Sequence, residues 1–181
     1  PDPTTGIGSW NDEDFVRAMR EGIGPNGQHY FPSFPYPAFS KMSEEDLLNL
    51  KDYIFSLPPI QQNNQSHELQ FPFNLRLNAW FWNVLFHDPK SIIPNPSRSA
   101  SWNRGRYLTE AVAHCAECHT PRNQLGVLRS DLAYAGAKEG PEGKLTPNIT
   151  PDKETGIGGW SQDDLVYALQ TGMVPNGDFL G

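Results

Sequence analysis

The sequence predicts an all-α protein, in which short helices are separated by long turns. Three observations favour this fold class. Proline and glycine, which interrupt regular structure, are abundant at 17 and 16 residues. The alternation of apolar and polar residues that marks half-buried strands is scarce. Several segments also begin at a capping residue and end at glycine or proline, as helices do.

Four segments carry these helix signals. The first covers Asn11–Glu21, with Asn11 as its N-cap and a glycine directly after it. The second, Ser43–Leu57, has an acidic first turn and stops at two prolines. The third runs from about Ser101 to Ala113 and has one apolar face. The fourth, Ser161–Thr171, repeats the plan of the first.

Residues 61–100 are predicted to form a connector that folds against its neighbours. The polar stretches "QQNNQS" and "PNPSRS" bracket the aromatic run "LNAWFWNVLF". This run is too short for a membrane span, which needs about 18 apolar residues. It suits a helix or a strand packed on a core.

An internal repeat indicates a duplicated domain. Residues 1–27 align without a gap on residues 151–177, and fourteen of the 27 positions are identical. The offset of 150 residues is too long for a solenoid and fits one small domain plus a connector. The sequence therefore predicts two related domains, at 1–60 and 101–181, joined by the connector.

The acidic net charge limits which kinds of macromolecule the chain is expected to bind. The net charge is −7 and the isoelectric point is about 5.1. Nucleic-acid binding requires a basic stripe, which this chain lacks. An acidic surface favours basic protein partners instead.

The chemistry is concentrated in "HCAECHTPRN", which starts at His114. Cys115 and Cys118, the only cysteines, are two residues apart and are followed at once by His119. This spacing is the attachment signature of c-type haem. Two thiols one helical turn apart can each add to one vinyl group of the porphyrin, while the next imidazole binds the iron.

Two other interpretations of the cysteine pair are less favoured. A zinc site needs four ligands, and His114 and His119 lie too close to the cysteines for tetrahedral geometry. A redox-active dithiol needs a thioredoxin-like βαβ surround, whereas a helix and a proline-rich loop flank this pair. His114 precedes the cysteines and is expected to pack or to face solvent.

The runs "NRGRYLTEAVAHCAECHTPRN" and "PNITPDKETGIGGWSQDDLVYALQTG" resemble class I cytochrome c domains of multi-haem c-type cytochromes. The likeness is greatest to the cytochrome c subunits of bacterial periplasmic alcohol, aldehyde and gluconate dehydrogenases. It implies one haem c in this chain and a second in the full-length protein. It also implies a periplasmic electron carrier, without catalysis of its own, between a dehydrogenase and a small cytochrome or oxidase. Attachment to the inner membrane through a segment outside this sequence stays open.

The resemblance further implies that both domains are incomplete here. Residues 1–60 match the C-terminal half of a first domain, and residues 101–181 match a second domain up to a point before its distal ligand. Phe34 stands where the family carries a methionine between prolines. Met42 is then the candidate axial ligand of the first-domain haem, with helix-start packing and His29 as alternatives. Met173 is expected to be a packing residue.

Phe34 leaves a second function class open. A di-haem enzyme such as a peroxidase needs one haem with an accessible distal side. An aromatic residue in place of the ligand would provide such a side. The spin state of the haem and its reaction with peroxide distinguish this alternative from a carrier.

Overall fold

The computed structural model describes residues 1–65, 67–69, 71, 74–138, 140 and 143–179. Within these ranges the regular structure is helical, and pairing between extended segments is limited to isolated bridges. The predicted all-α class is confirmed in this respect. No helix of this described part is long and apolar enough to cross a membrane. The chain divides into two compact units, Pro1–His114 and Cys115–Gly181.

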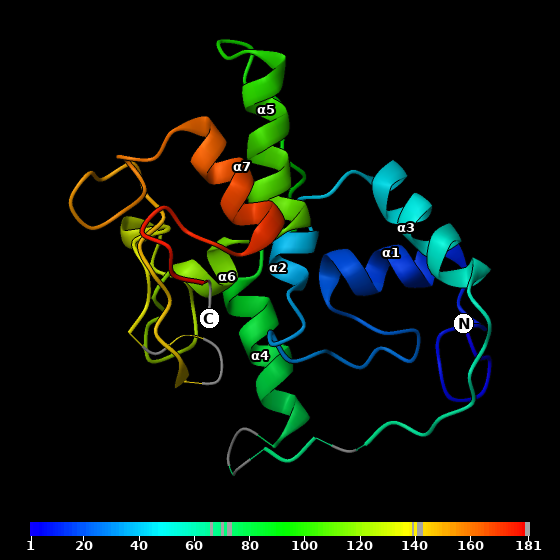
Figure 1. Ribbon diagram of the computed structural model, residues 1–181. Coiled ribbons are helices and arrows are strands. Elements are labelled where there is room, and N and C mark those ends of the chain that lie inside the picture. Colours follow the sequence, from blue (N-terminus) through cyan, green and yellow to red (C-terminus); the bar gives the residue numbers. More distant parts are fainter. Residues whose placement is uncertain (66, 70, 72–73, 139, 141–142, 180–181) are drawn as a thin grey trace. The chain divides into compact units, whose positions relative to one another are not determined.

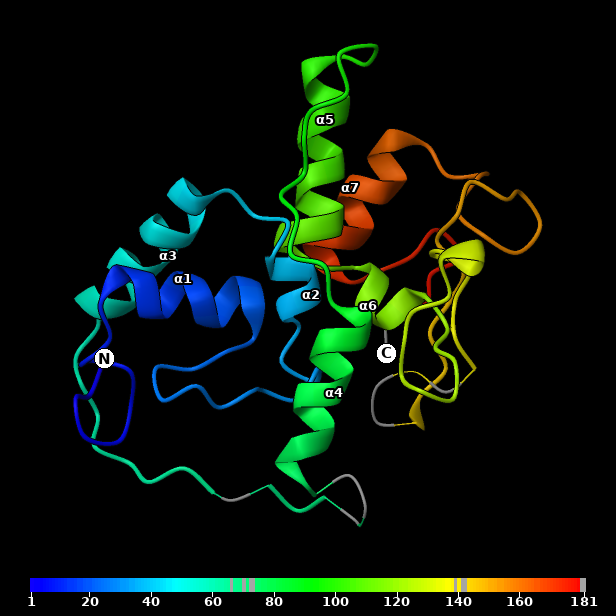
Figure 2. The same ribbon diagram turned by 180° about the vertical axis from the view of Figure 1, so that it is seen from behind.

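The first unit is organised around two helices that lie side by side in both views (Figures 1 and 2). Helix α1 spans Asp12–Glu21, and α3 spans Glu44–Ser56. Both begin at the predicted caps: Asn11 accepts a hydrogen bond from the backbone of the third helical residue, and Ser43 does the same. Helix α1 ends at Gly22 in the left-handed conformation.

A short helix, α2, covers Tyr36–Phe39 and joins these two elements. Tyr36 is fully buried, and a Cβ added to Gly22 would lie 2.6 Å from its ring. Glycine at the end of α1 therefore gives the ring room as well as the required φ. The sequence did not predict α2, because its "YPAF" segment has no capping side chain.

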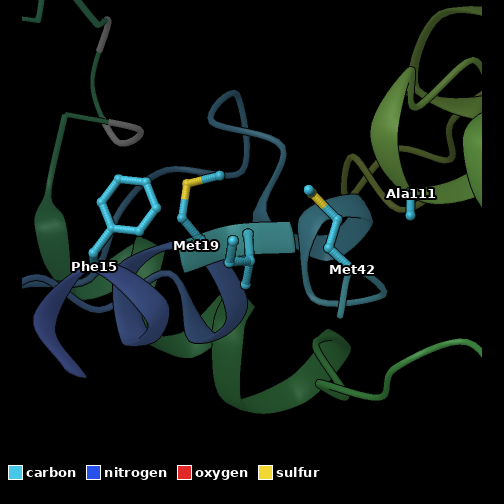
Figure 3. Packing of buried hydrophobic residues seen from close by; sticks show 5 residues of the cluster. Phe15, Met19, Met42 and Ala111 are labelled. Atoms are coloured by element: carbon cyan, nitrogen blue, oxygen red, sulfur yellow. The ribbon is translucent and has the colours of Figure 1, made fainter. Parts of the chain in front are cut away.

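The core cluster of the first unit consists of five buried residues (Figure 3). Helix α1 contributes two of them and α3 one, and Phe34 and Phe39 pack against them. Burial of such side chains contributes about 1.5–3 kcal/mol each for the large ones. The members are Phe15, Met19, Met42, Leu47 and Ala111.

The aromatic run of the connector forms helix α4, Arg76–Phe86. Its side chain Asn83 donates from Nδ2 to the Glu21 carbonyl oxygen at 2.6 Å, and His87 Nε2 lies 2.7 Å from the Arg20 carbonyl oxygen. These two residues satisfy carbonyls that the end of α1 leaves without helical partners. The connector thus folds against the first unit, as expected for part of residues 61–100.

The predicted third helix is α5, Ala100–Tyr107, which continues as a π-helix, η1, over Leu108–Val112. Ser99 caps its start, slightly before the predicted boundary. Tyr107 receives a hydrogen bond from the Ser43 backbone at 3.1 Å and donates one to Asp46. The helix is thereby tied to the start of α3.

The described part of the second unit contains two α-helices, α6 (Ala116–His119) and α7 (Gln162–Thr171), and a 3₁₀ turn, η2 (Ser130–Leu132). Helix α7 begins with a capping box between Ser161 and Asp164, the same device that opens α1. The bridges repeat too: Ile23 pairs with His29 and Met173 with Phe179, both at the offset of 150 residues.

Candidate haem-binding site

The two cysteines lie on one turn of helix at the start of the second unit. Cys115 has helical dihedrals directly before α6, and the His119 amide donates to the Cys115 carbonyl at 3.0 Å. Cys118 follows three residues later, so both thiols project from one face of the turn. Both are free and half-buried. The pair can therefore reach two neighbouring groups of one ligand.

The imidazole of His119 is held by a distant loop. Its Nδ1 lies 2.8 Å from the carbonyl oxygen of Pro147, 28 residues further along the chain. A carbonyl oxygen can only accept, so Nδ1 carries a hydrogen, and in the neutral imidazole this leaves the lone pair on Nε2. A neutral imidazole with its second nitrogen fixed in this way is the usual form of a metal-bound histidine.

The loop that holds His119 is itself fixed to the attachment turn. The Gly136 amide donates to the His119 carbonyl at 2.8 Å, and Thr146 Oγ1 donates to the Cys118 carbonyl at 2.7 Å. Thr120, only 3% exposed, receives a hydrogen bond from the Tyr134 amide at 3.0 Å. These bonds position the cysteine turn and the Pro147 loop together.

A hollow of about 890 Å³ lies beside this loop. Its volume falls within the range of about 300–1,000 Å³ typical of cofactor sites. Leu132, Leu145 and Ala135 give it apolar walls, while Arg122 and Asn148 add polar groups. Leu145 is 75% exposed. Cys115, Cys118 and His119 do not line this hollow, so the fit to a haem rests on the attachment turn, which offers two thiols and one imidazole.

The thiol chemistry argues against a redox-active dithiol. Burial raises the pKa of the Cys115 thiol. Catalytic cysteines have a lowered thiol pKa, because the thiolate is the reactive form. Zinc gains no support either, since in the described part of the chain no three side chains of the His, Cys, Asp and Glu types gather at metal-binding distance.

The candidate distal ligands of the first domain lie in different surroundings. Met42 is 6% exposed within the core cluster, and Figure 3 shows its thioether extending to the same side as that of Met19. Phe34 packs against this cluster. His29 is half-buried, which lowers its pKa, and its Nδ1 has no hydrogen-bond partner.

Met173 is engaged by its own unit. Its sulfur accepts a hydrogen bond from the Tyr167 hydroxyl at 3.6 Å, and its backbone pairs with Phe179. The corresponding residue of the first repeat is Ile23, which occupies the same kind of bridge. The backbone bridge at this position therefore does not require sulfur.

An attachment motif of this type on a helical scaffold defines the c-type cytochromes as a class. The comparisons with known proteins agree. The chain is 40% identical over 182 residues to a di-haem cytochrome c-type protein of Cereibacter sphaeroides, with 100% of the chain and 60% of that protein covered. It is 37% identical to the cytochrome subunit of fructose dehydrogenase from Gluconobacter japonicus, where 95% of the chain matches 35% of that protein.

A third relative is the cytochrome c subunit of gluconate 2-dehydrogenase from Pantoea cypripedii, at 35% identity over 95% of the chain and 41% of that protein. Cytochrome c subunits of quinone-dependent alcohol dehydrogenases match at 31–32% identity. The resemblance to multi-haem c-type cytochromes is thus confirmed. The chain spans 60% or less of the length of these relatives. No family model matches it.

Proposed function

We propose that this chain binds one haem c through thioether bonds to Cys115 and Cys118 and carries single electrons. His119 is the proposed axial ligand of the iron. The observation that carries the proposal is the hydrogen bond from His119 Nδ1 to the Pro147 carbonyl, at 2.8 Å. It leaves Nε2 as the one nitrogen able to bind iron, beside two thiols on the same helical turn.

The bound haem would supply an iron that alternates between the ferrous and ferric states. The residues of the chain bind and orient it. The thiols would anchor the ring edge, and the hydrogen bond to the Pro147 carbonyl would orient the His119 imidazole.

We also propose the division into cytochrome c domains at residues 1–60 and 101–181, with 61–100 between them. The repeated capping boxes of α1 and α7 and the paired bridges support it. A second haem would then belong to the first domain, and Met42 would be its axial ligand. The buried thioether of Met42 in the core cluster is compatible with this role and equally with packing.

The proposed partners follow from the relatives, several of which are named as subunits of dehydrogenases. We propose that the chain accepts electrons from a dehydrogenase in the periplasm and passes them to a small cytochrome or an oxidase. In this role the chain has no catalytic residue of its own. The relatives described above are not named peroxidases, so nothing in them favours the di-haem peroxidase alternative.

The test is haem retention after denaturing electrophoresis of the full-length protein matured in a periplasm. Replacing both Cys115 and Cys118 by alanine should abolish covalent haem at this site, because the chain has no other thiol. His119→Ala should keep the thioethers but change the iron spectrum. His67→Ala, at an exposed histidine, is the matched control. Wild-type staining of the site in the double cysteine variant would refute the assignment.

A further inference from the structure

Helix α6 ends at His119, so the carbonyls of Cys118 and His119 lie beyond its internal hydrogen bonds. Both receive hydrogen bonds from one distant loop. The Thr146 hydroxyl donates to the Cys118 carbonyl oxygen at 2.7 Å, and the Gly136 amide donates to the His119 carbonyl oxygen at 2.8 Å. The Cys118 carbonyl belongs to the peptide group that joins Cys118 to His119. The Thr146 hydroxyl therefore fixes the backbone from which the His119 imidazole projects.

The Thr146 side chain is itself held in one orientation. Its amide and carbonyl pair with Ala137 at 2.9 and 3.0 Å, and its Oγ1 accepts a hydrogen bond from the Ala137 amide at 3.1 Å. A Cβ added to Gly140 would lie 2.7 Å from the Thr146 methyl carbon, so this methyl group packs closely against Gly140. The hydroxyl has one hydrogen to donate, and the Cys118 carbonyl is a nearer acceptor than the Ala137 carbonyl at 3.4 Å. These contacts direct the hydrogen to Cys118.

The next residue, Pro147, holds the same histidine at a second point. Its carbonyl oxygen lies 2.8 Å from Nδ1 of the imidazole. One dipeptide thus fixes both the peptide group before His119 and the outer edge of its ring. Because residues 146 and 147 are joined covalently, a shift of Thr146 changes the distance between the Pro147 carbonyl and the ring.

We propose that Thr146 is a positioning residue that sets the strength of the hydrogen bond between His119 and Pro147, and thereby the reduction potential of the haem attached at this turn. This inference rests on the proposed function. A hydrogen bond from Nδ1 raises the basicity of the ligating nitrogen, and a more basic ligand stabilises ferric over ferrous iron. Without the Thr146 hydroxyl, the loop is released from the Cys118 carbonyl and the bond to Nδ1 weakens. The reduction potential then rises.

The experiment uses the full-length protein matured in a periplasm and replaces Thr146 in two ways. Thr146→Val removes the hydroxyl and keeps a β-branched side chain of similar size. Thr146→Ser keeps the hydroxyl and removes the methyl group. Thr171→Val is the matched control, because the Thr171 hydroxyl also donates to a carbonyl, that of Tyr167 at 2.8 Å, and accepts from an amide, that of Met173 at 3.1 Å. These bonds lie at the end of α7 and do not involve the attachment turn.

Two quantities are measured in each variant. The midpoint potentials of the haems come from spectroelectrochemical titration, and proton NMR of the ferrous protein gives the rate at which the His119 ring N–H exchanges with deuterated water. Thr146→Val should raise one midpoint potential and speed this exchange severalfold while covalent haem is retained. Thr146→Ser and Thr171→Val should match the wild type in both quantities.

Wild-type potentials and exchange in Thr146→Val would overturn the inference, even if that variant unfolds more easily, and so would equal changes in Thr171→Val. An altered potential in Thr146→Ser would overturn it as well, because the methyl contact would then be responsible. Thr146→Ser decides the question even where Thr146→Val retains no haem, since wild-type behaviour in it supports the role of the hydroxyl. Absence of covalent haem at Cys115 and Cys118 in the wild-type protein would instead refute the proposed function.

Discussion

Substitution of Gly136 tests most sharply whether the Pro147 loop positions the His119 imidazole. Its φ is 83°, and its amide donates to the His119 carbonyl at 2.8 Å. A Cβ added here would lie 2.7 Å from the Thr146 carbonyl oxygen and 2.8 Å from Pro147 and Asn148 backbone atoms. Real Cβ atoms do not approach backbone atoms this closely, so Gly136→Ala must displace the loop that carries the Pro147 carbonyl.

The expected cost of Gly136→Ala has two parts. Left-handed backbone costs a non-glycine residue about 1–2 kcal/mol. Displacing the loop also breaks the hydrogen bond between His119 and the Pro147 carbonyl, which costs about 1 kcal/mol. Gly177→Ala measures the backbone contribution alone, because the φ of Gly177 is 86° but an added Cβ would meet nothing within 4 Å. We expect Gly177→Ala to lower the free energy of unfolding by about 1–2 kcal/mol and Gly136→Ala by about 2–3 kcal/mol.

The assay is urea unfolding of the haem-loaded protein, followed by circular dichroism and by the iron absorption bands. Gly136→Ala should also alter the iron spectrum, because the His119 imidazole loses its fixed acceptor. Gly177→Ala should leave that spectrum unchanged. Equal stability losses in both variants, with an unaltered spectrum in each, would show that the loop does not position His119 in the way described.

Three further predictions concern the scaffold. Asn83→Ala should cost about 1–3 kcal/mol in urea unfolding, because the Glu21 carbonyl loses its buried partner; Asn63→Ala, at an exposed position, should cost nothing measurable. Asn11→Ala and Ser161→Ala should each lower thermal stability by about 1 kcal/mol through loss of a helix cap, and equal melting temperatures to wild type would contradict the caps. Burial lowers the pKa of His87 despite its hydrogen bond to Arg20, so the unfolded state binds the proton more readily. The free energy of unfolding should therefore fall as the pH drops below about 6.5. A His87→Gln variant should lose less stability in acid, and an unchanged acid dependence would refute this cause.

The helix starts could be predicted because capping is local. Asn11, Ser43 and Ser161 each bond to an amide three residues ahead, so a short stretch of sequence contains the whole interaction. Helix α4 was predicted only as a helix or a strand, because apolar residues occur on all sides of it. The contacts that hold this segment against the first unit join Asn83 and His87 to the end of α1, more than sixty residues away, so local sequence does not reveal them.

In the candidate site, too, the local features could be predicted and the distant contacts could not. The spacing of Cys115, Cys118 and His119 predicts the attachment chemistry without any structure. The acceptor for His119 could not be predicted, because Pro147 lies 28 residues away in a loop without periodic signals. The left-handed backbone of His114 was also missed, because histidine adopts this conformation more often than most residues but still too rarely for the sequence alone to signal it.

The most direct test of the account is mass spectrometry of the tryptic peptide from Tyr107 to Arg122, prepared from protein matured in a periplasm. This peptide contains both thiols and His119. The account predicts that the peptide carries one haem and that neither cysteine reacts with iodoacetamide. A haem-free peptide in which both Cys115 and Cys118 are alkylated would contradict it.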